Sequence, residues 1–314
     1  MVEKVVYPAM RQRQRTGINK RQRSDNLQGY LFISPFLFGF FVFTLFPMIA
    51  SWYLAMTKYS GIGAPKWIGL RNFANMFADS TFYGSLGVTF QYALILVPFR
   101  LAFSLLIAML LCSRGRRGLG LYRTVFYVPS LMGGSVAIAM VWAKLFGSDG
   151  AINAILNNLG LLTQNSWVGE PDSALYVLIL LGIWQFGSAM LIFVSGLKQI
   201  PESYYEAAII DGASATQRFT YITLPSLSPI IFFNLIMGII SSFKAFTESY
   251  IITNGGPFDK TLVYALYIYR QAFEFGKMGY ACALAWMLVF IISLLALIVF
   301  RSSNNWVHYE AKGE

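Results

Sequence analysis

The residues with the most chemistry to offer are a few polar and charged side chains set inside long apolar runs. A charged group near the middle of a bilayer is expensive unless it is buried or paired, so each is a candidate for contact with a solute. The candidates are Arg100, Trp184, Gln185, Asn234, Lys244 and Glu248. Side chains of these types can hold a ligand by charge, stacking or hydrogen bonds, which favours binding over catalysis.

Two of these groups are cations whose positions can be inferred from spacing. Arg100 precedes Cys112, the inner end of its run, by twelve residues, or about 18 Å of helix, and so lies near the midplane. Lys244 and Glu248 are four residues apart, so we expect them to face one another on a helix. An ion pair that holds the helix end and contact with a solute explain that spacing equally well.

The neutral candidates allow two interpretations. Trp184 and Gln185 offer a stacking plane and an amide, which suit a sugar, although a core aromatic beside a satisfied amide is the commoner arrangement. Asn234 more often forms a hydrogen bond between helices than binds a ligand. Arg100 and Lys244 bring positive charge without a matching pair of buried acids, which suggests an anionic solute, for example an acidic oligosaccharide such as an alginate fragment.

Catalysis has little support in the sequence. The only histidine is His308, in a polar tail, and Cys112 and Cys282 are expected on opposite membrane faces. No cluster of Cys, His and Asp has metal-ligand spacing, which argues against an intramembrane enzyme and a metal site. The sequence has no Gly-x-x-x-x-Gly-Lys-Ser/Thr loop, so we expect no nucleotide cofactor and no ATP hydrolysis in this chain.

The elements that must position these residues are membrane helices. Of 314 residues, 56% are hydrophobic and 12% charged, whereas about a quarter of a soluble domain is charged. Six runs are long and apolar enough to cross a bilayer. They cover about 30–56, 86–112, 121–146, 174–197, 227–247 and 280–300. The predicted fold is therefore an all-α integral membrane protein with a six-span domain over residues 29–301.

The net charge of +10 follows the topology of these spans. Basic residues concentrate in segment 1–28 and around Arg114–Arg117. Because loops on the cytoplasmic side carry an excess of Lys and Arg, this alternation indicates which loops face the cytoplasm. We therefore expect cytoplasmic termini, including the tail 302–314, and no nucleic-acid partner. Segment 1–28 is interpreted as a solvated topogenic tail, with contact to anionic membrane lipid as the less favoured alternative.

The third outward segment, 248–279, contains an amphipathic pattern. Leu262, Leu266, Tyr269 and Phe273 recur at helical spacing, which predicts a helix lying along the outer membrane interface.

The inward loop 198–226 differs in kind from the other loops. Pro201 can open a helix, Gly212 supplies a break, and Ser214 followed by Gln217 has the spacing of a capping box for a second short helix. A side chain at Gly212 is expected to obstruct the turn. Two short helices around a glycine turn form a knob suited to docking with another protein.

From Glu206 to Pro225 this loop reads EAAIIDGASATQRFTYITLP, which closely resembles the EAA motif of ATP-binding-cassette (ABC) importer permeases. The matching positions are Glu206, Ala207, Ala208, Asp211, Gly212, Ala213, Phe219, Ile222, Leu224 and Pro225. The resemblance implies a coupling helix seated in a cleft of a nucleotide-binding subunit, in which Glu206 meets a basic group. The bland alternative is that Glu206 only caps or solvates an exposed loop.

The resemblance extends over nearly the whole chain, including Trp67–Phe73 and the Gly-Gly-Pro segment Thr253–Pro257, and it is to carbohydrate-uptake permeases of the maltose and glycerol-phosphate type. It implies the type I ABC importer permease architecture and the first of two permease subunits. The implied partners are a homologous second permease, two ATPase subunits that bind ATP and Mg²⁺, and an extracytoplasmic solute-binding protein. The implied location is the bacterial inner membrane. An ion- or proton-coupled secondary transporter would explain the spans but not the motif.

Overall fold

The computed structural model describes residues 20–112, 119–161 and 165–308, and it is helical over most of that length. The chain divides into two compact units, Met1–Ser51 and Trp52–Glu314, and each is described by itself.

The first unit is an apolar helix interrupted by a π-helical turn. Its elements are α1 (Lys20–Phe40), η1 (Phe41–Leu45) and the start of α2 (Phe46–Ala55). The stretch Gln28–Ala55 is long and apolar enough to cross a membrane, in agreement with the predicted first span. Residues 1–19 of the predicted basic segment, the arginines at 114–117 and tail residues 309–314 lie outside the described part of the chain.

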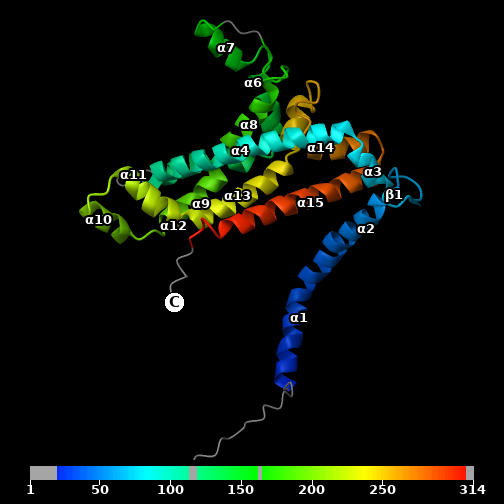
Figure 1. Ribbon diagram of the computed structural model, residues 1–314, viewed down its shortest axis with the longest axis horizontal. Helices are drawn as coiled ribbons and strands as arrows, with labels where there is room; N and C mark the ends of the chain where they lie inside the picture. Colours follow the sequence, from blue (N-terminus) through cyan, green and yellow to red (C-terminus); the bar gives the residue numbers. More distant parts are fainter. Residues whose placement is uncertain (1–19, 113–118, 162–164, 309–314) are drawn as a thin grey trace, which may run out of the picture. The chain divides into compact units, whose positions relative to one another are not determined.

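Three helices form the frame of the second unit. They are α4 (Ser80–Cys112), α13 (Ser228–Phe243) and α15 (Met278–Ser303). Helix α13 lies between the other two and packs against both (Figure 1). A Cβ added at Gly238 of α13 would lie 3.0 Å from Val97 Cγ1 of α4, so the small residue permits close contact of the two helices.

The remaining predicted spans are bent pairs of helices. The pairs are α5 (Leu119–Met132) with α6 (Val136–Leu145), α8 (Ala174–Trp184) with α9 (Gly187–Leu197), and the segment Ala215–Ser226 with α13. Their bends are 97°, 41° and 65°, and counting each pair as one span gives up to six spans among the described residues. The six predicted runs therefore correspond to spans, and the bends within three of them are what the sequence did not predict; at the break after α8, side chains bind the Gln185 carbonyl in place of a helical hydrogen bond.

Two span ends also differ from the prediction. Helix α4 begins at Ser80, six residues early, because Asp79 Oδ1 accepts a hydrogen bond of 2.9 Å from the Thr81 N–H as an N-terminal cap. Helix α13 ends at Phe243, four residues before the predicted end.

One end of the second unit is built from short elements. They are β1 (Thr57–Lys58), antiparallel β2 (Lys66–Trp67), α3 (Arg71–Phe77), η3 (Ser249–Thr253), α14 (Tyr264–Tyr269) and η4 (Arg270–Glu274). The predicted interfacial helix is corrected here: Leu262 and Leu266 are buried in a core cluster with Phe82 and Leu284. The Tyr264 hydroxyl donates to the Leu284 carbonyl, which ties α14 into the protein core.

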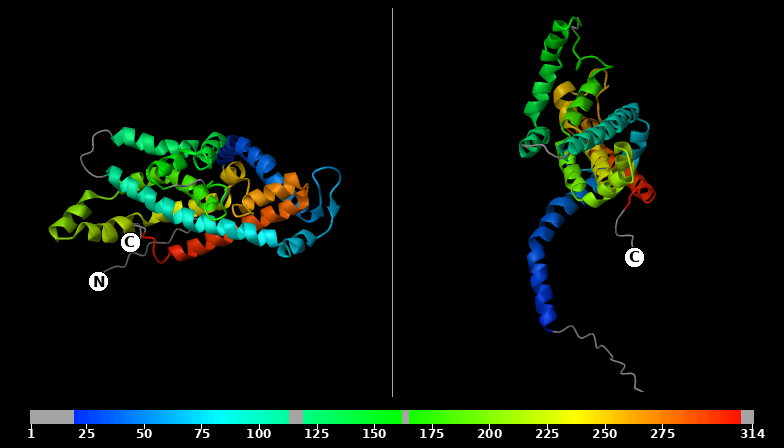
Figure 2. Two further views of the ribbon diagram at one scale, coloured as in Figure 1. Left: turned by 90° about the horizontal axis from the view of Figure 1, so that it is seen from above. Right: turned by 90° about the vertical axis from the view of Figure 1, so that its left-hand side faces the viewer.

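The opposite end carries the loop singled out by the sequence. Its elements are α10 (Glu202–Ile210), α11 (Ala215–Arg218), η2 (Phe219–Thr223) and α12 (Leu224–Ser226). Figures 1 and 2 show α10 and α11 at one end of the second unit and β1 and α3 at the other. A further short helix, α7 (Ala151–Asn158), follows α6.

Candidate functional site

The turn between α10 and α11 is built from backbone hydrogen bonds. The Ala213 N–H donates to the Ala208 carbonyl at 2.8 Å, and the Gly212 N–H donates to the Ile209 carbonyl at 3.1 Å. This pair of bonds is a Schellman motif, which requires a left-handed residue at the position of Gly212. Gly212 has φ +76°, and a Cβ added there would meet nothing within 4 Å. The need for glycine is therefore conformational, which corrects the expectation that a side chain would obstruct the turn.

The second helix of the loop starts as the sequence predicts. Ser214 Oγ accepts from the Gln217 N–H, and Gln217 Oε1 accepts from the Ser214 N–H, which completes a capping box. The Tyr205 hydroxyl is 2.9 Å from Thr223 Oγ1 and ties α10 to η2. Both short helices are thus held in one arrangement.

The loop presents a mixed surface that is suited to a protein partner. Glu206, Ala207 and Asp211 are exposed, while Ala208, Ala213, Phe219 and Pro225 are half-buried. Ile210 is 85% exposed and Leu224 38% exposed. An exposed apolar patch beside an acidic group and small alanines is typical of an interaction site.

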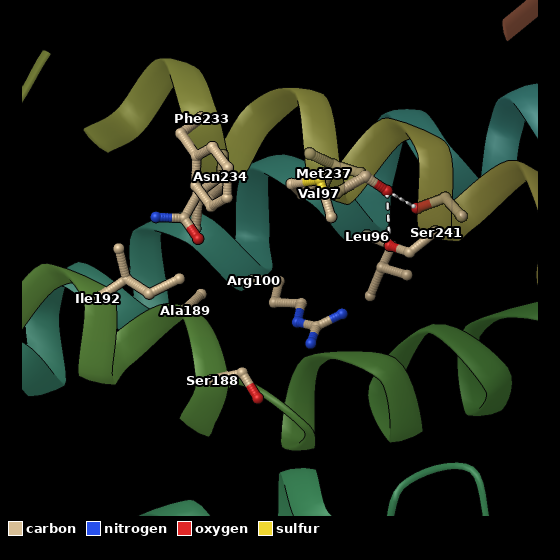
Figure 3. Close-up of a pocket in the computed structure, with 13 residues that line it drawn as sticks. Leu96, Val97, Arg100, Ser188, Ala189, Ile192, Phe233, Asn234, Met237 and Ser241 are labelled. Atoms are coloured by element: carbon tan, nitrogen blue, oxygen red, sulfur yellow. Dashed lines mark hydrogen bonds between the residues drawn. The ribbon is translucent and has the colours of Figure 1, made fainter. Parts of the chain in front are cut away.

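A cavity of about 350 Å³ lies between α4, α9 and α13, and Figure 3 shows its lining. Arg100 points into it from α4, while Asn234 and Ser241 line it from α13 and Ser188 lines it from α9. Polar groups from three helices therefore converge on one pocket, which is open on the side of the exposed Ser188 and Ser241, and such convergence is the usual setting of a ligand site.

The guanidinium of Arg100 also holds the break between α8 and α9. Its Nη2 donates to the Gln185 carbonyl at 2.8 Å, and Ser130 Oγ donates to the same oxygen at 2.9 Å. Among the described residues, Arg100 Nε has no hydrogen-bond partner. Arg100 is thus anchored by one arm, while its Nε is buried and left without a partner in the described part of the chain.

Trp184 and Gln185 do not line this cavity. The Gln185 Nε2 donates to the Gly133 carbonyl at 2.9 Å, and the Trp184 ring lies 5.5 Å from the Trp142 ring. The structure places both at the junction of α8 with α5 and α6, which is the core arrangement described above as the commoner one.

Asn234 is brought into the cavity, whereas Lys244 and Glu248 are not paired. Asn234 Nδ2 donates to the Ile230 carbonyl of its own helix at 3.0 Å. Helix α13 ends before Lys244, which is exposed, and no ion pair in the described part of the chain joins it to Glu248. The predicted facing pair is therefore wrong, because residues 244–246 interrupt the helix. Glu248 instead lies within electrostatic range of Arg100.

Sequence reasoning missed the neutral cavity residues Ser188, Ser241 and Ser242. Serines in an apolar run carry no spacing signal, and only the packing of α9 against α13 brings these ones together. The described residues contain no cluster of His, Cys, Asp and Glu that could hold a metal.

Comparisons with known proteins point in one direction. A family model described as "Binding-protein-dependent transport system inner membrane component" matches residues 106–305. The probable ABC transporter permease protein YesP of Bacillus subtilis is 54% identical over 295 residues, which cover 93% of this chain and 95% of YesP. The arabinooligosaccharides transport system permease protein AraP of the same organism is 30% identical over 305 residues, which cover 96% of each.

Solved structures share the fold. One chain of a bacterial ABC transporter involved in the import of the acidic polysaccharide alginate matches with a TM-score of 0.78 and 23% identity, covering 91% of this chain and 99% of that chain. A chain of a bacterial alginate ABC transporter in complex with an alginate pentasaccharide-bound periplasmic protein matches with a TM-score of 0.79 and 22% identity, covering 91% and 97%.

Proposed function

Because the chain belongs to the inner membrane components of binding-protein-dependent transport systems, we infer that it is the permease subunit of a carbohydrate ABC importer. Its fold is the type I importer permease fold that the motif predicted. The observation that carries the function is the exposed α10–α11 knob, whose geometry suits a socket in another protein. The chain is a non-catalytic membrane subunit.

The finer assignments extend this proposal. The partners are a homologous second permease, two ATPase subunits that hold ATP and Mg²⁺, and an extracytoplasmic solute-binding protein. The knob is on the cytoplasmic side, as are both termini, and the membrane is the bacterial inner membrane. Support comes from the motif Glu206–Pro225, from basic loops on the same predicted side, and from the family's dependence on a binding protein.

The proposed mechanism is alternating access driven through the knob. ATP-dependent closure of the ATPase subunits pulls the docked α10 and α11 of each permease together, and hydrolysis reverses the motion. The 65° bend between α12 and α13 transmits this movement, because α13 carries Asn234 and Ser241 to the cavity wall. Leu227 at the bend is fully buried in a core cluster, so the two segments move against a packed pivot.

The proposed solute is an acidic oligosaccharide. Arg100 is the one charged residue among those that line the cavity in the described part of the chain, and its charge is available to form charge-assisted hydrogen bonds with a carboxylate. Glu248 lies within electrostatic range of this guanidinium but forms no ion pair with it among the described residues, and a cation without a direct counter-ion favours an anionic ligand over a neutral one.

Reconstitution tests both levels of the proposal. The complete complex in proteoliposomes is supplied with uronate or neutral oligosaccharides, each with its binding protein, and ATPase stimulation and uptake are measured. We expect stimulation by uronates. Stimulation by neutral sugars alone would exclude the acidic solute, and uptake without ATP or ATPase subunits would favour a secondary transporter.

A further inference from the structure

A second cavity, of about 780 Å³, opens at the end of the second unit away from α10 and α11. Its walls come from the β1–β2 ribbon, the start of α3, and the junction of η4 with α15. Its volume falls in the range typical of small-molecule sites. In the proposed orientation, it faces the side from which solute arrives.

The cleft is lined by four cations and a single acid. The cations are Lys58, Lys66, Arg71 and Lys277. Within the described ranges, no carboxylate forms an ion pair with any of them. The single acid of the lining, Asp79, is already engaged by the hydroxyls of Tyr267 and Tyr280. The cleft therefore carries excess positive charge.

The β1–β2 ribbon places two lysines, which carry like charges, directly opposite one another. Lys58 and Lys66 are direct cross-strand partners, so their side chains leave the ribbon on the same face. Like charges directly opposite one another destabilise a strand pair. An anion bound between them would turn this repulsion into attraction.

A buried acceptor adds a second, independent indication. Gln271 lines the cleft with 7% exposure, and its Oε1 has no hydrogen-bond partner among the described residues. An unsatisfied buried acceptor is costly, so a turn of the Gln271 side chain towards the cleft, where a ligand hydroxyl can donate to Oε1, would stabilise it.

The floor of the cleft is preformed. Asn72 is buried, and its Nδ2 donates to the Ala55 carbonyl at 2.8 Å and to the Thr57 carbonyl at 2.9 Å. These bonds hold α3 against the chain that leads into β1. The backbone of the floor would therefore need little reorganisation on binding, and the required movement is the turn of the Gln271 side chain.

We propose that this cleft binds a uronate unit of an acidic oligosaccharide, with the Lys58–Lys66 pair at the carboxylate and Gln271 accepting from a ring hydroxyl. A neutral sugar would leave the lysine pair uncompensated, and an anion without hydroxyls would leave Gln271 unsatisfied. The proposal rests on the proposed import of acidic oligosaccharides and adds a site separate from the Arg100 cavity. An acidic surface of a protein partner is the competing occupant.

The test uses the complete transporter complex in zwitterionic nanodiscs without its binding protein. Calorimetric titration with trigalacturonate is compared with neutral galactotriose and with tricarballylate, which has three carboxylates and no hydroxyls. We expect trigalacturonate to bind most tightly and the Lys58→Gln/Lys66→Gln variant to bind it about tenfold more weakly, the effect of losing one charge-assisted hydrogen bond. The exposed Lys260→Gln is the matched control and should bind normally.

The variant provides its own folding control, since removal of like-charge repulsion should leave the Tm unchanged or higher. Equal affinity of wild type and the double variant for trigalacturonate would overturn the proposal. So would absence of sugar binding combined with weaker capture of the binding protein by the variant, which would assign the cleft to protein docking. Uptake in proteoliposomes tests the proposed solute separately. Import restricted to neutral sugars would exclude an acidic solute, and the titration would still show whether the cleft binds a uronate.

Discussion

The two ends of the second unit are built on different principles. At the α10–α11 end, one contiguous stretch supplies the turn, the capping box and the exposed acid. At the opposite end, the contacts join residues far apart in the chain, such as Asp79 with Tyr267 and Tyr280. The knob is therefore specified by local sequence, whereas the opposite end forms only when distant segments of the chain pack together.

Charge reversal at the local end should have the largest effect. Glu206→Lys places a like charge against the expected basic group of the ATPase subunit, and loss of such a pair costs about 2–5 kcal/mol, or at least about thirtyfold. We expect uptake to fall by that factor while affinity for the binding protein is unchanged. Proteoliposome uptake and binding-protein capture check this. Asp172→Lys, an exposed acid outside the knob, is the control, and normal uptake by Glu206→Lys would refute the docking role.

The second-largest effect is expected at the Arg100 cavity, which, unlike the knob, is formed by tertiary packing. Arg100→Gln removes the charge proposed to bind the solute, and a hydrogen bond to a charged group contributes about 1.5–3 kcal/mol. We expect about tenfold slower uptake of a uronate oligosaccharide, with a smaller decrease in Tm from the lost bond to the Gln185 carbonyl.

Arg100→Lys separates the two roles, since it keeps the charge but loses the planar fork. It should restore part of the uronate uptake. If both variants lose Tm equally and neither changes uptake, Arg100 serves only to hold the junction of α8 and α9.

The structure of the knob could be predicted from the sequence because it is specified by residues close together in the chain. Capping boxes and glycine turns are short-range, so Ser214, Gln217 and Gly212 could be read directly. The bend at Gln185 could not, because its carbonyl is claimed by Arg100, 85 positions earlier in the chain. The supposed pairing of Lys244 with Glu248 failed likewise, since helical spacing holds only while the helix continues.

A smaller effect should come from the backbone of the knob. Gly212→Ala forces an alanine into the left-handed region at φ +76°, which costs about 1–2 kcal/mol. We expect intact folding but weaker ATPase stimulation, measured with the loaded binding protein. Gly212→Asn is the matched variant, because Asn tolerates this conformation, and it should retain most of the stimulation. Equal loss in both would mean that the side chain, not the backbone angle, disturbs docking.

The smallest effect should come from the long-range contacts at the opposite end. Burial would raise the pKa of Asp79, but hydrogen bonds from Tyr267, Tyr280 and the Thr81 N–H outweigh it and leave the pKa below its ordinary value. A carboxylate with a depressed pKa in the folded state stabilises the protein at neutral pH, and this contribution is lost as the pH falls through that lowered value. Asp79→Asn should therefore lower the Tm at pH 7 by about 2–4 °C, the shift expected for about 1 kcal/mol.

The pH dependence distinguishes this network from a purely packing role. The pKa of Tyr267 is raised to about 12, mainly by burial and secondly by its hydrogen bond to Asp79. Its hydroxyl therefore stays protonated at neutral pH and donates to the Asp79 carboxylate. The Tm difference between wild type and Asp79→Asn, followed by thermal melts from pH 7 towards pH 3, should shrink as Asp79 protonates. A Tm difference that stays constant over this range would show that Asp79 stabilises the protein by packing and not by its charge. The two ends of the second unit would then differ only in the sequence separation of the residues in contact. Asp172→Asn, at an exposed acid that forms no ion pair among the described residues, is the control and should show no such convergence.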